Sequence, residues 1–501
     1  MLTRLQVSGF KNLVDVDVRF GPFTCIAGAN GVGKSNLFDA IQLLSFLADR
    51  PLIEAALAVR GGRTSGVQSL FHRIGEDCAS LISFTAEMIV PSQGEDDYGQ
   101  EAKATSTFLR YTLHLAYRED SEHGSLGTIE IEKEELDYIT QGDALAHLLF
   151  DHSASRWRRS VVRSARRTGS PFISTEGEGD ERVIRMHQDG GSRGKPLTYS
   201  ANRLPRTVLS GSNAAESPTA LLARREMQSW RLLQLEPSSL RKPDPFTAPP
   251  RLGPDGSHLA ATLYRLNRRS DEENGGEPVR HRAIPSNGHV YSQVANRLAE
   301  LYEDVHDLWV DRDEKRELLT VHVRTRDGTD HPAPALSDGS LRFLALAVLE
   351  MDTEDRGVLC LEEPENGVHP ERLPKMLHLL QDITVEVQEE VDADNPMRQV
   401  IVNTHSPAVV QQVPEDCLVV AVPHEIVQNN KRFKAVAFQA LSDTWRLRGE
   451  NPPDPVSLGN LLGYLNPVTL ENLRLQQEGG RRKPTVAERP DVQPLLPLSI
   501  S

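Results

Sequence analysis

The 501-residue chain lacks the hydrophobic segments that mark a membrane or secreted protein. No apolar run approaches the 18 or so residues that a helix needs to cross a bilayer. The first residues, Met1–Gln6, do not contain the hydrophobic core of a signal peptide. We therefore expect a cytoplasmic protein with no membrane partner.

Cysteine is scarce as well: the chain has four cysteines and no C-x-x-C pair among them. This excludes a disulfide framework and a zinc site built on paired cysteines. Cys25 and Cys360 fall within apolar runs, where a thiol behaves as a small hydrophobic side chain.

An excess of positive charge is also missing, because the formal net charge is −15 at pH 7. This excludes a protein that coats nucleic acid with its whole surface, although it allows a local basic groove. One segment is strongly basic and contains six arginines: Arg156, Arg158, Arg159, Arg163, Arg166 and Arg167. This segment is the best candidate in the chain for a contact with DNA phosphates, with Trp157 able to stack on a base. The alternatives are a solvated charged edge or a surface that pairs with an acidic partner.

The chain does contain a glycine-rich motif near its start. Residues 28–35, G-A-N-G-V-G-K-S, fit G-x-x-x-x-G-K-[ST] at every fixed position. The preceding run Phe23–Ala27 predicts a short buried strand, and 36–48 predicts a helix with its apolar residues on one face. This is the context that the motif requires, whereas a chance glycine-rich turn explains neither flank.

The motif predicts a site for ATP and Mg²⁺. Its glycines let backbone N–H groups point at phosphate oxygens, and the helix N-terminus adds the positive end of a dipole. Lys34 can reach the β- and γ-phosphates, and Ser35 can ligate Mg²⁺. The predicted nucleotide-binding residues are Asn30, Gly31, Val32, Gly33, Lys34, Ser35 and Asn36.

Two adjacent carboxylates follow the apolar run Val358–Leu361 in the last third of the chain. Glu362 can hold Mg²⁺ directly or through water, and Glu363 can orient and polarise the attacking water. Alone, the pair would more simply cap the following turn. With the glycine-rich loop upstream, the pair favours a phosphoryl-transfer site.

Two further positions complete the predicted site. His405 follows the apolar run Val400–Val402 and is placed to sense the γ-phosphate, although a lone histidine there is more often structural. Ser337 and Gly339 precede an apolar helix at 341–351 and offer a hydroxyl, N–H groups and a helix dipole to an anion. By itself, this turn is a common capping sequence.

Taken together, these motifs resemble those of the ABC-type ATPases of the RecF, Rad50/SMC and OLD branch. The matching segments occur in the family's order: the opening Leu5–Leu13, the loop Gly28–Ser35, the signature-like Leu336–Ser340, the Walker B run Val358–Glu363, the D-loop-like Pro364–Pro370, and His405. Two departures from transporter signatures, Asp338 in place of glycine and Ser340 in place of glutamine, fit the RecF-like branch.

The resemblance implies an α/β fold: a two-lobed ABC-type P-loop ATPase head with a β-rich and helical insertion between the Walker A and signature motifs. It implies that two heads dimerise on ATP, with Ser337 and Gly339 of one subunit facing the phosphate loop of the other. It assigns Glu362 to Mg²⁺, Glu363 as the catalytic base and His405 as the switch. It also gives Lys11 and Asn12 as nucleotide contacts and Gln68 as a Q-loop residue near the metal.

The implied domains are an ATPase lobe at 1–90, a β-rich insertion with flexible loops at 91–255, a helical subdomain at 256–330, a second ATPase lobe at 331–470 and a disordered tail at 476–501. Within them we predict mobile loops at 92–104 and 174–196. We also predict an amphipathic helix through Val294, Leu298, Leu301, Val305 and Leu308, and a helical stretch at 370–391.

The resemblance is nearest to the stand-alone ATPases of prokaryotic anti-phage systems such as Septu, PARIS and some retrons. It implies a homodimer or higher oligomer whose ATP cycle gates DNA engagement or a partner effector, a nuclease or toxin encoded nearby. No Asp-x-Asp pair of a Toprim nuclease follows His405, so we expect an ATPase without intrinsic nuclease activity. The alternative is a RecF-like DNA repair ATPase that acts without an effector. A third hypothesis, the engine of a transporter, does not suit the signature.

Overall fold

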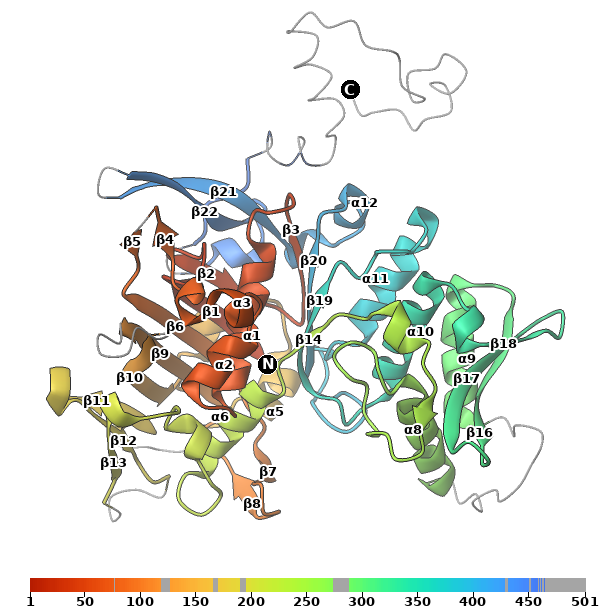
Figure 1. Cartoon of the computed structure of the whole chain (residues 1–501), viewed down its shortest axis with the longest axis horizontal. Helices are drawn as coiled ribbons and strands as arrows, with labels where there is room; N and C mark the ends of the chain where they lie inside the picture. The colour runs from red at the N-terminus through yellow and green to blue at the C-terminus, as the bar shows by residue number, and fades with distance from the viewer. Residues whose placement is uncertain are drawn as a thin grey trace, which may run out of the picture. The chain divides into compact units, whose positions relative to one another are not determined.

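A six-stranded sheet carries the glycine-rich loop at one of its edges (Figure 1). Its strands lie in the order β14 (Arg231–Leu233), β19 (Gly357–Glu362), β20 (Arg398–Thr404), β3 (Phe23–Ala27), β21 (Leu418–Gln428) and β22 (Lys431–Ala440). The first five run parallel, and β22 is antiparallel to β21. Because parallel strands end at the same edge of a sheet, the segments that follow β3, β14, β19 and β20 meet there.

This computed structural model describes residues 1–75, 77–118, 127–164, 170–189, 195–273, 288–428, 431–449, 452–457, 459, 461 and 464. The helices and strands named here lie in one unit, Met1–Val456, and Ser457–Ser501 form a separate unit. The predicted disordered tail at 476–501 lies outside the described residues. No helix in the described part of the chain is long and apolar enough to cross a membrane.

A second sheet joins the N-terminal strands to those of the predicted insertion. Its eight strands lie in the order β13 (Leu197–Ser200), β12 (Val183–Met186), β11 (Ile173–Glu176), β10 (Thr128–Tyr138), β9 (Phe108–Arg118), β6 (Leu81–Ile89), β1 (Leu2–Ser8) and β2 (Val16–Arg19). All neighbours in it are antiparallel. Strands from 1–90 and from 91–255 therefore belong to one continuous sheet.

Helix α1 (Lys34–Leu47) packs against both sheets. One continuous hydrophobic cluster joins Leu37 and Leu44 of this helix to Leu5 of β1 and to Ile401 of β20. Burying large aliphatic side chains in this way contributes about 1.5–3 kcal/mol each. The first turn of α1, which follows the glycine-rich loop, is thus held at the edge of the core sheet.

The part of the chain drawn in green in Figure 1 is a helical subdomain with a small sheet. Its helices are α8 (Leu259–Glu273), α9 (His289–Leu301) and α10 (Asp338–Met351), joined by α11 (Leu373–Asp382). Its strands are β15 (Asp244–Pro245), β16 (Val305–Asp313), β17 (Leu318–Thr325) and β18 (Asp330–Pro332).

The helix predicted through Leu308 is wrong at its C-terminal end. Helix α9 stops at Leu301, and Val305 and Leu308 lie in strand β16. The register of β16 with β17 shifts between Val305 and Asp307. Such a bulge puts two residues spaced by three on the same face of a strand, which imitates helical spacing. The helical stretch predicted at 370–391 also ends early, at Asp382.

Both predicted mobile loops contain strands. The segment 92–104 forms the hairpin of β7 (Gln93–Glu95) and β8 (Glu101–Lys103), whose Ala102 is buried against α6 (Pro218–Gln228). Asp96 shapes its turn by accepting hydrogen bonds from the N–H groups of Tyr98 and Gln100. The segment 174–196 contains most of β11 and all of β12. The polar, glycine-containing composition of these segments is typical of loops and concealed the strands.

A buried carboxylate ties the second sheet to the loop that follows it. Glu87 of β6 is 1% exposed and lies 3.1 Å from Arg110, 3.5 Å from Arg4 and 2.8 Å from His147 Nδ1. Burial works to raise the pKa of Glu87, but His147, Arg110 and Arg4 outweigh burial and lower it.

We expect Glu87→Gln to lower the free energy of unfolding by about 3 kcal/mol at pH 7, because it removes the buried charge that Arg4, Arg110 and His147 surround and leaves Arg4 with Asp17 alone. A lowered pKa gives stability that is present above the ordinary glutamate value of 4.5 and lost as the pH falls through the folded-state pKa. The difference between variant and wild type should therefore shrink below pH 4.5 in urea denaturation. Glu130→Gln, in the exposed pair with Arg118, is the control and should cost below about 1 kcal/mol. An equal loss at all pH values would contradict the electrostatic account.

Candidate functional site

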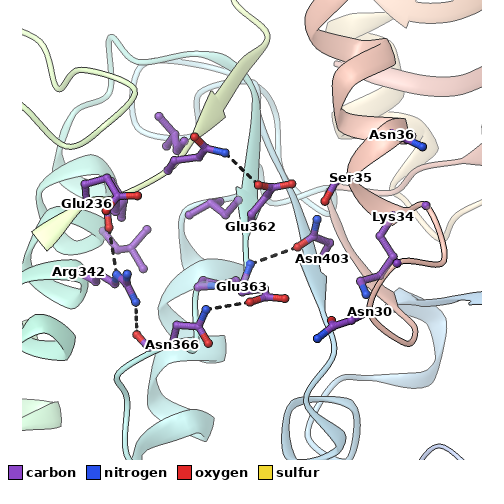
Figure 2. A pocket seen from close by; sticks show the side chains of 18 residues that line it. Asn30, Lys34, Ser35, Asn36, Glu236, Arg342, Glu362, Glu363, Asn366 and Asn403 are labelled. Atoms are coloured by element: carbon purple, nitrogen blue, oxygen red, sulfur yellow. Dashed lines mark hydrogen bonds between the residues drawn. The ribbon is translucent and has the colours of Figure 1, made fainter. Parts of the chain in front are cut away.

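A cavity of about 530 Å³ lies at the edge of the core sheet where four parallel strands end (Figure 2). Eight predicted site residues line it: Asn30, Gly31, Gly33, Lys34, Ser35, Asn36, Glu362 and Glu363. Gln234, Glu236, Arg342, Asn366 and Asn403 complete its polar wall. The glycine-rich loop and the paired glutamates, far apart in sequence, therefore share one cavity.

The glycine-rich loop leaves the first turn of α1 free for an anion. Gly33 precedes α1 with a φ of 118°, a conformation that disfavours other residues, and no side chain caps the helix. A Cβ at Gly33 would come within 2.3 Å of the Asn12 side chain. The N–H groups of the first turn thus combine with the helix dipole in a phosphate-binding arrangement.

Asn12 supports this loop from behind instead of lining the cavity. Its Nδ2 donates to the Val32 carbonyl at 2.9 Å, and its Oδ1 accepts from Asn36 Nδ2 at 2.7 Å. Val32 is not in the cavity wall either. Both were predicted as nucleotide contacts. The structure places Asn12 behind the glycine-rich loop, where it holds the carbonyl of the loop residue Val32.

Lys34 lies at the centre of the site. Its ammonium donates to the carbonyls of Gly28 at 2.6 Å and Ala29 at 3.0 Å. Burial lowers the pKa of Lys34, and the nearby carboxylates of Glu363, Glu365 and Glu362 oppose that shift. A cation held by loop carbonyls beside three carboxylates is placed to bind a polyphosphate.

Glu362, at the end of β19, is held by three donors. Its Oε1 accepts from Arg60 at 2.8 Å and its Oε2 from Gln234 at 2.9 Å, while the Ser35 hydroxyl is also within hydrogen-bonding reach. Burial acts to raise the pKa of Glu362, but these donors outweigh burial and lower it. Figure 2 shows Ser35 and Glu362 next to each other. A hydroxyl and an ionised carboxylate this close fit Mg²⁺, which prefers oxygen ligands together with phosphate and water.

Glu363 is oriented by partners on both carboxylate oxygens. Oε1 lies 2.6 Å from His405 Nδ1, and Oε2 accepts from Asn366 Nδ2 at 2.9 Å. Its backbone has a φ of 46°, and its N–H donates to the Asn403 carbonyl at 3.0 Å. A non-glycine residue in this region is strained and persists only when its surroundings fix it. The turn after β19 thus directs Glu363 into the cavity, and His405 contacts Glu363 without lining the wall.

Gln68 does not line the cavity, contrary to its predicted place near the metal. It lies in the short 3-10 helix Val67–Leu70. Gln234, directly after β14, occupies that place and contacts Glu362. The signal in the sequence was the apolar pair Leu232–Leu233 followed by a polar residue, the same pattern as in β19 and β20. A three-residue strand was too short to recognise.

Lys11 is also outside the cavity. Its ammonium pairs with Asp39 Oδ2 of α1 at 2.6 Å and donates to the Arg60 carbonyl at 2.9 Å. The structure thus does not bring Lys11 to the cavity wall, and its contact with nucleotide stays a prediction. Lys11 connects the opening strand to α1 and to the segment of Arg60.

The signature-like turn lies apart from this cavity. Ser337 caps helix α10 by accepting from the Ser340 N–H, and its hydroxyl is 3.3 Å from that of Tyr302. Gly339 packs so closely that a Cβ would lie 2.4 Å from the Gly367 carbonyl. Neither predicted residue lines the cavity that contains Lys34.

The basic segment differs from its prediction. Trp157 is 0% exposed and packs between Phe150 and His152, so it is not available to stack on a base. Arg156 pairs with Glu389 of the same chain at 2.6 Å. Of the six arginines, Arg156, Arg159 and Arg163 are exposed, Arg158 is half-buried, and Arg166 and Arg167 lie outside the described residues.

Comparison with known proteins places this site in a family. The family profile described as "AAA domain, putative AbiEii toxin, Type IV TA system" matches residues 23–93 and 125–411, more than half of the chain. The DNA replication and repair protein RecF of Porphyromonas gingivalis is 36% identical over 84 residues, which are 16% of this chain and 23% of that protein. The OLD nuclease of Thermus scotoductus is 50% identical over 44 residues, 9% of this chain and 8% of that protein.

A longer match is to RecF of Clavibacter sepedonicus, 24% identical over 228 residues, which are 44% of this chain and 55% of that protein. The chain thus spans about a quarter to a half of the RecF proteins that it matches here. Among solved structures, an SMC head bound to the C-winged helix domain of ScpA overlaps 88% of this chain and 98% of that chain at 12% identity, with a TM-score of 0.46.

These findings confirm the predicted α/β P-loop fold and the predicted relationship. The chain's local similarity to RecF proteins and to an OLD nuclease agrees with the resemblance found in the sequence. The chain belongs to this AAA-domain family.

Proposed function

We propose that the protein binds ATP with Mg²⁺ in the 530 Å³ cavity and hydrolyses the ATP. The observation that carries this proposal is the shared wall, to which the glycine-rich loop contributes Lys34 and Ser35 and strand β19 contributes Glu362 and Glu363. Lys34 and the first-turn amides of α1 hold the phosphates, and Ser35 and Glu362 hold Mg²⁺. When bound, Mg²⁺ neutralises charge on the phosphate oxygens.

Glu363 is the proposed general base. One of its oxygens is directed by His405 and the other by Asn366, so the carboxylate has a fixed orientation toward the cavity. It can accept the proton of a water that attacks the γ-phosphate. Gln234 has a positioning role, because it holds the second oxygen of Glu362.

We further propose that ATP joins two copies of the chain. Ser337 is exposed at the N-terminus of α10, and this helix dipole favours an anion. Because Ser337 is exposed and does not line its own chain's cavity, it is available to face the γ-phosphate of a second copy. Gly339 is buried and contributes by letting the start of α10 pack closely against Gly367. The expected assembly is a homodimer or a higher oligomer with nucleotide between the heads.

The biological role that we propose is gating of DNA engagement or of a partner effector in anti-phage defence. The profile that the chain matches is described by a putative toxin of a toxin–antitoxin system, and one relative is an OLD nuclease. The RecF relatives favour the alternative, a repair ATPase that acts on DNA without an effector. Affinity purification from the native host during phage infection separates the two, because defence requires a co-purifying nuclease or toxin.

We expect Glu363→Gln to bind ATP as wild type does and to hydrolyse it about 10²–10⁴-fold more slowly, the usual contribution of a general base. The variant should accumulate as an ATP-dependent dimer in size-exclusion chromatography with light scattering. Glu371→Gln, whose side chain is 87% exposed, is the matched control and should turn over normally. Normal turnover in Glu363→Gln would place the catalytic carboxylate elsewhere.

We expect Gln234→Ala to weaken Mg²⁺-dependent binding of a fluorescent ATP analogue about tenfold, as is typical when a partner of a metal ligand is removed. Gln68→Ala should have no such effect, because Gln68 does not line the cavity. Titration with nucleotide at several Mg²⁺ concentrations measures both. A larger loss of Mg²⁺-dependent affinity in Gln68→Ala than in Gln234→Ala would instead support Gln68 as the residue near the metal.

If the basic segment contacts DNA, Arg159→Ala/Arg163→Ala should weaken duplex binding and reduce the slope of log K against log salt by about 1.8, the value for two lost phosphate contacts. Arg316→Ala, at a position 79% exposed in the helical subdomain, serves as the control. Fluorescence anisotropy at several salt concentrations gives the slope. An unchanged slope would leave the segment as a surface that pairs with acidic groups.

A further inference from the structure

Arg60 forms an ion pair with Glu362, the carboxylate that we propose as a ligand of Mg²⁺. Its Nη2 lies 2.8 Å from Glu362 Oε1, and Gln234 takes Oε2 of the same carboxylate. Both oxygens of Glu362 therefore already have protein donors. A divalent cation that binds Glu362 comes close to the guanidinium, and like charges at such a distance repel strongly where water is partly excluded.

A second acceptor for Arg60 lies beside the first. Asp39 of α1 is 1% exposed, and its Oδ2 is taken by Lys11. Its Oδ1 is buried and has no hydrogen-bond partner among the described residues, and Arg60 Nε is 3.5 Å away. A buried carboxylate oxygen without a hydrogen bond is costly, so one more donor there would be favourable.

The backbone around Arg60 suits a change of side-chain partner. Lys11 Nζ donates to the Arg60 carbonyl at 2.9 Å, which anchors the residue next to Asp39. The Arg60 side chain itself is 46% exposed and can rotate. Gly61, with a φ of 89°, follows directly and turns the chain into α3 (Gly62–Ser65).

We propose that Arg60 is a two-position counter-ion, which competes with Mg²⁺ for Glu362 and moves to Asp39 Oδ1 when the metal binds. The proposal rests on the proposed role of Glu362 as a metal ligand. Arg60 is a positioning residue on this account, because it acts on Glu362 and not on the reacting atoms. The exchange would also pass the state of the metal site to the segment that contains α3.

The test measures metal affinity directly, by electron paramagnetic resonance titration of Mn²⁺ with a non-hydrolysable ATP analogue. We expect Arg60→Gln to bind Mn²⁺ about tenfold more tightly, the change that corresponds to about 1.4 kcal/mol. Arg63→Gln is the matched control, since Arg63 is exposed three residues further on and, among the described residues, is not part of the cavity wall. Weaker or unchanged Mn²⁺ binding by Arg60→Gln would overturn the proposal.

Asp39→Asn removes the negative charge of the second acceptor and so weakens its hold on the guanidinium. We expect weaker Mn²⁺ binding in the wild-type background and no further loss in Arg60→Gln. A purely structural role for Asp39 would weaken binding equally in both backgrounds, which would count against the exchange. If Asp39→Asn does not fold, the comparison of Arg60→Gln with Arg63→Gln still decides. Glu362→Gln tests the proposed function separately: unchanged Mn²⁺ binding in that variant would remove the metal site itself, whatever Arg60 does.

Discussion

The ladder of hydrogen bonds between β3 and β20, and between β20 and β19, is the constraint on which the site depends. Cys25 pairs with Val402, and Leu361 pairs with the same residue from the other side. This register brings Gly28 and Glu362 to the same edge of the sheet. Gln399 reinforces it at the other end of β20, because its side chain bonds both Leu2 and Gly21. A one-residue slip of a buried strand would turn every side chain to the wrong face.

The carboxylates in and behind the site differ in their surroundings, and their pKa values therefore shift in different directions. Glu362 has three donors and a lowered pKa, whereas burial raises the pKa of Glu365 three residues later, although Thr404 donates to it. Asp39, behind the loop, also has a pKa raised by burial despite Lys11. Desolvation and hydrogen bonding act on all three, and their balance differs from one to the next. The site thus keeps an ionised carboxylate where a cation is expected.

Sequence reasoning succeeded where a motif is local. The glycine-rich loop, Glu362 and Glu363 each follow a recognisable apolar strand, and parallel pairing alone then brings them together. It failed where tertiary pairing decides. Gln234 follows a strand of three residues, which becomes visible only beside β19. Trp157 was assigned to solvent because of its arginine neighbours, but Phe150 and His152 cover it. The bulge at Val305 imitated a helix because both geometries allow a spacing of three.

The hydrogen bond between Leu2 and Gln399 joins residues 397 positions apart in sequence. Contacts between residues so far apart in sequence form late in folding. The entropy lost in closing the long intervening chain must be overcome before the contact stabilises the fold. During synthesis, β3 emerges from the ribosome long before its two partner strands exist. Its backbone edges therefore stay unpaired and prone to aggregation until β20 and β21 arrive.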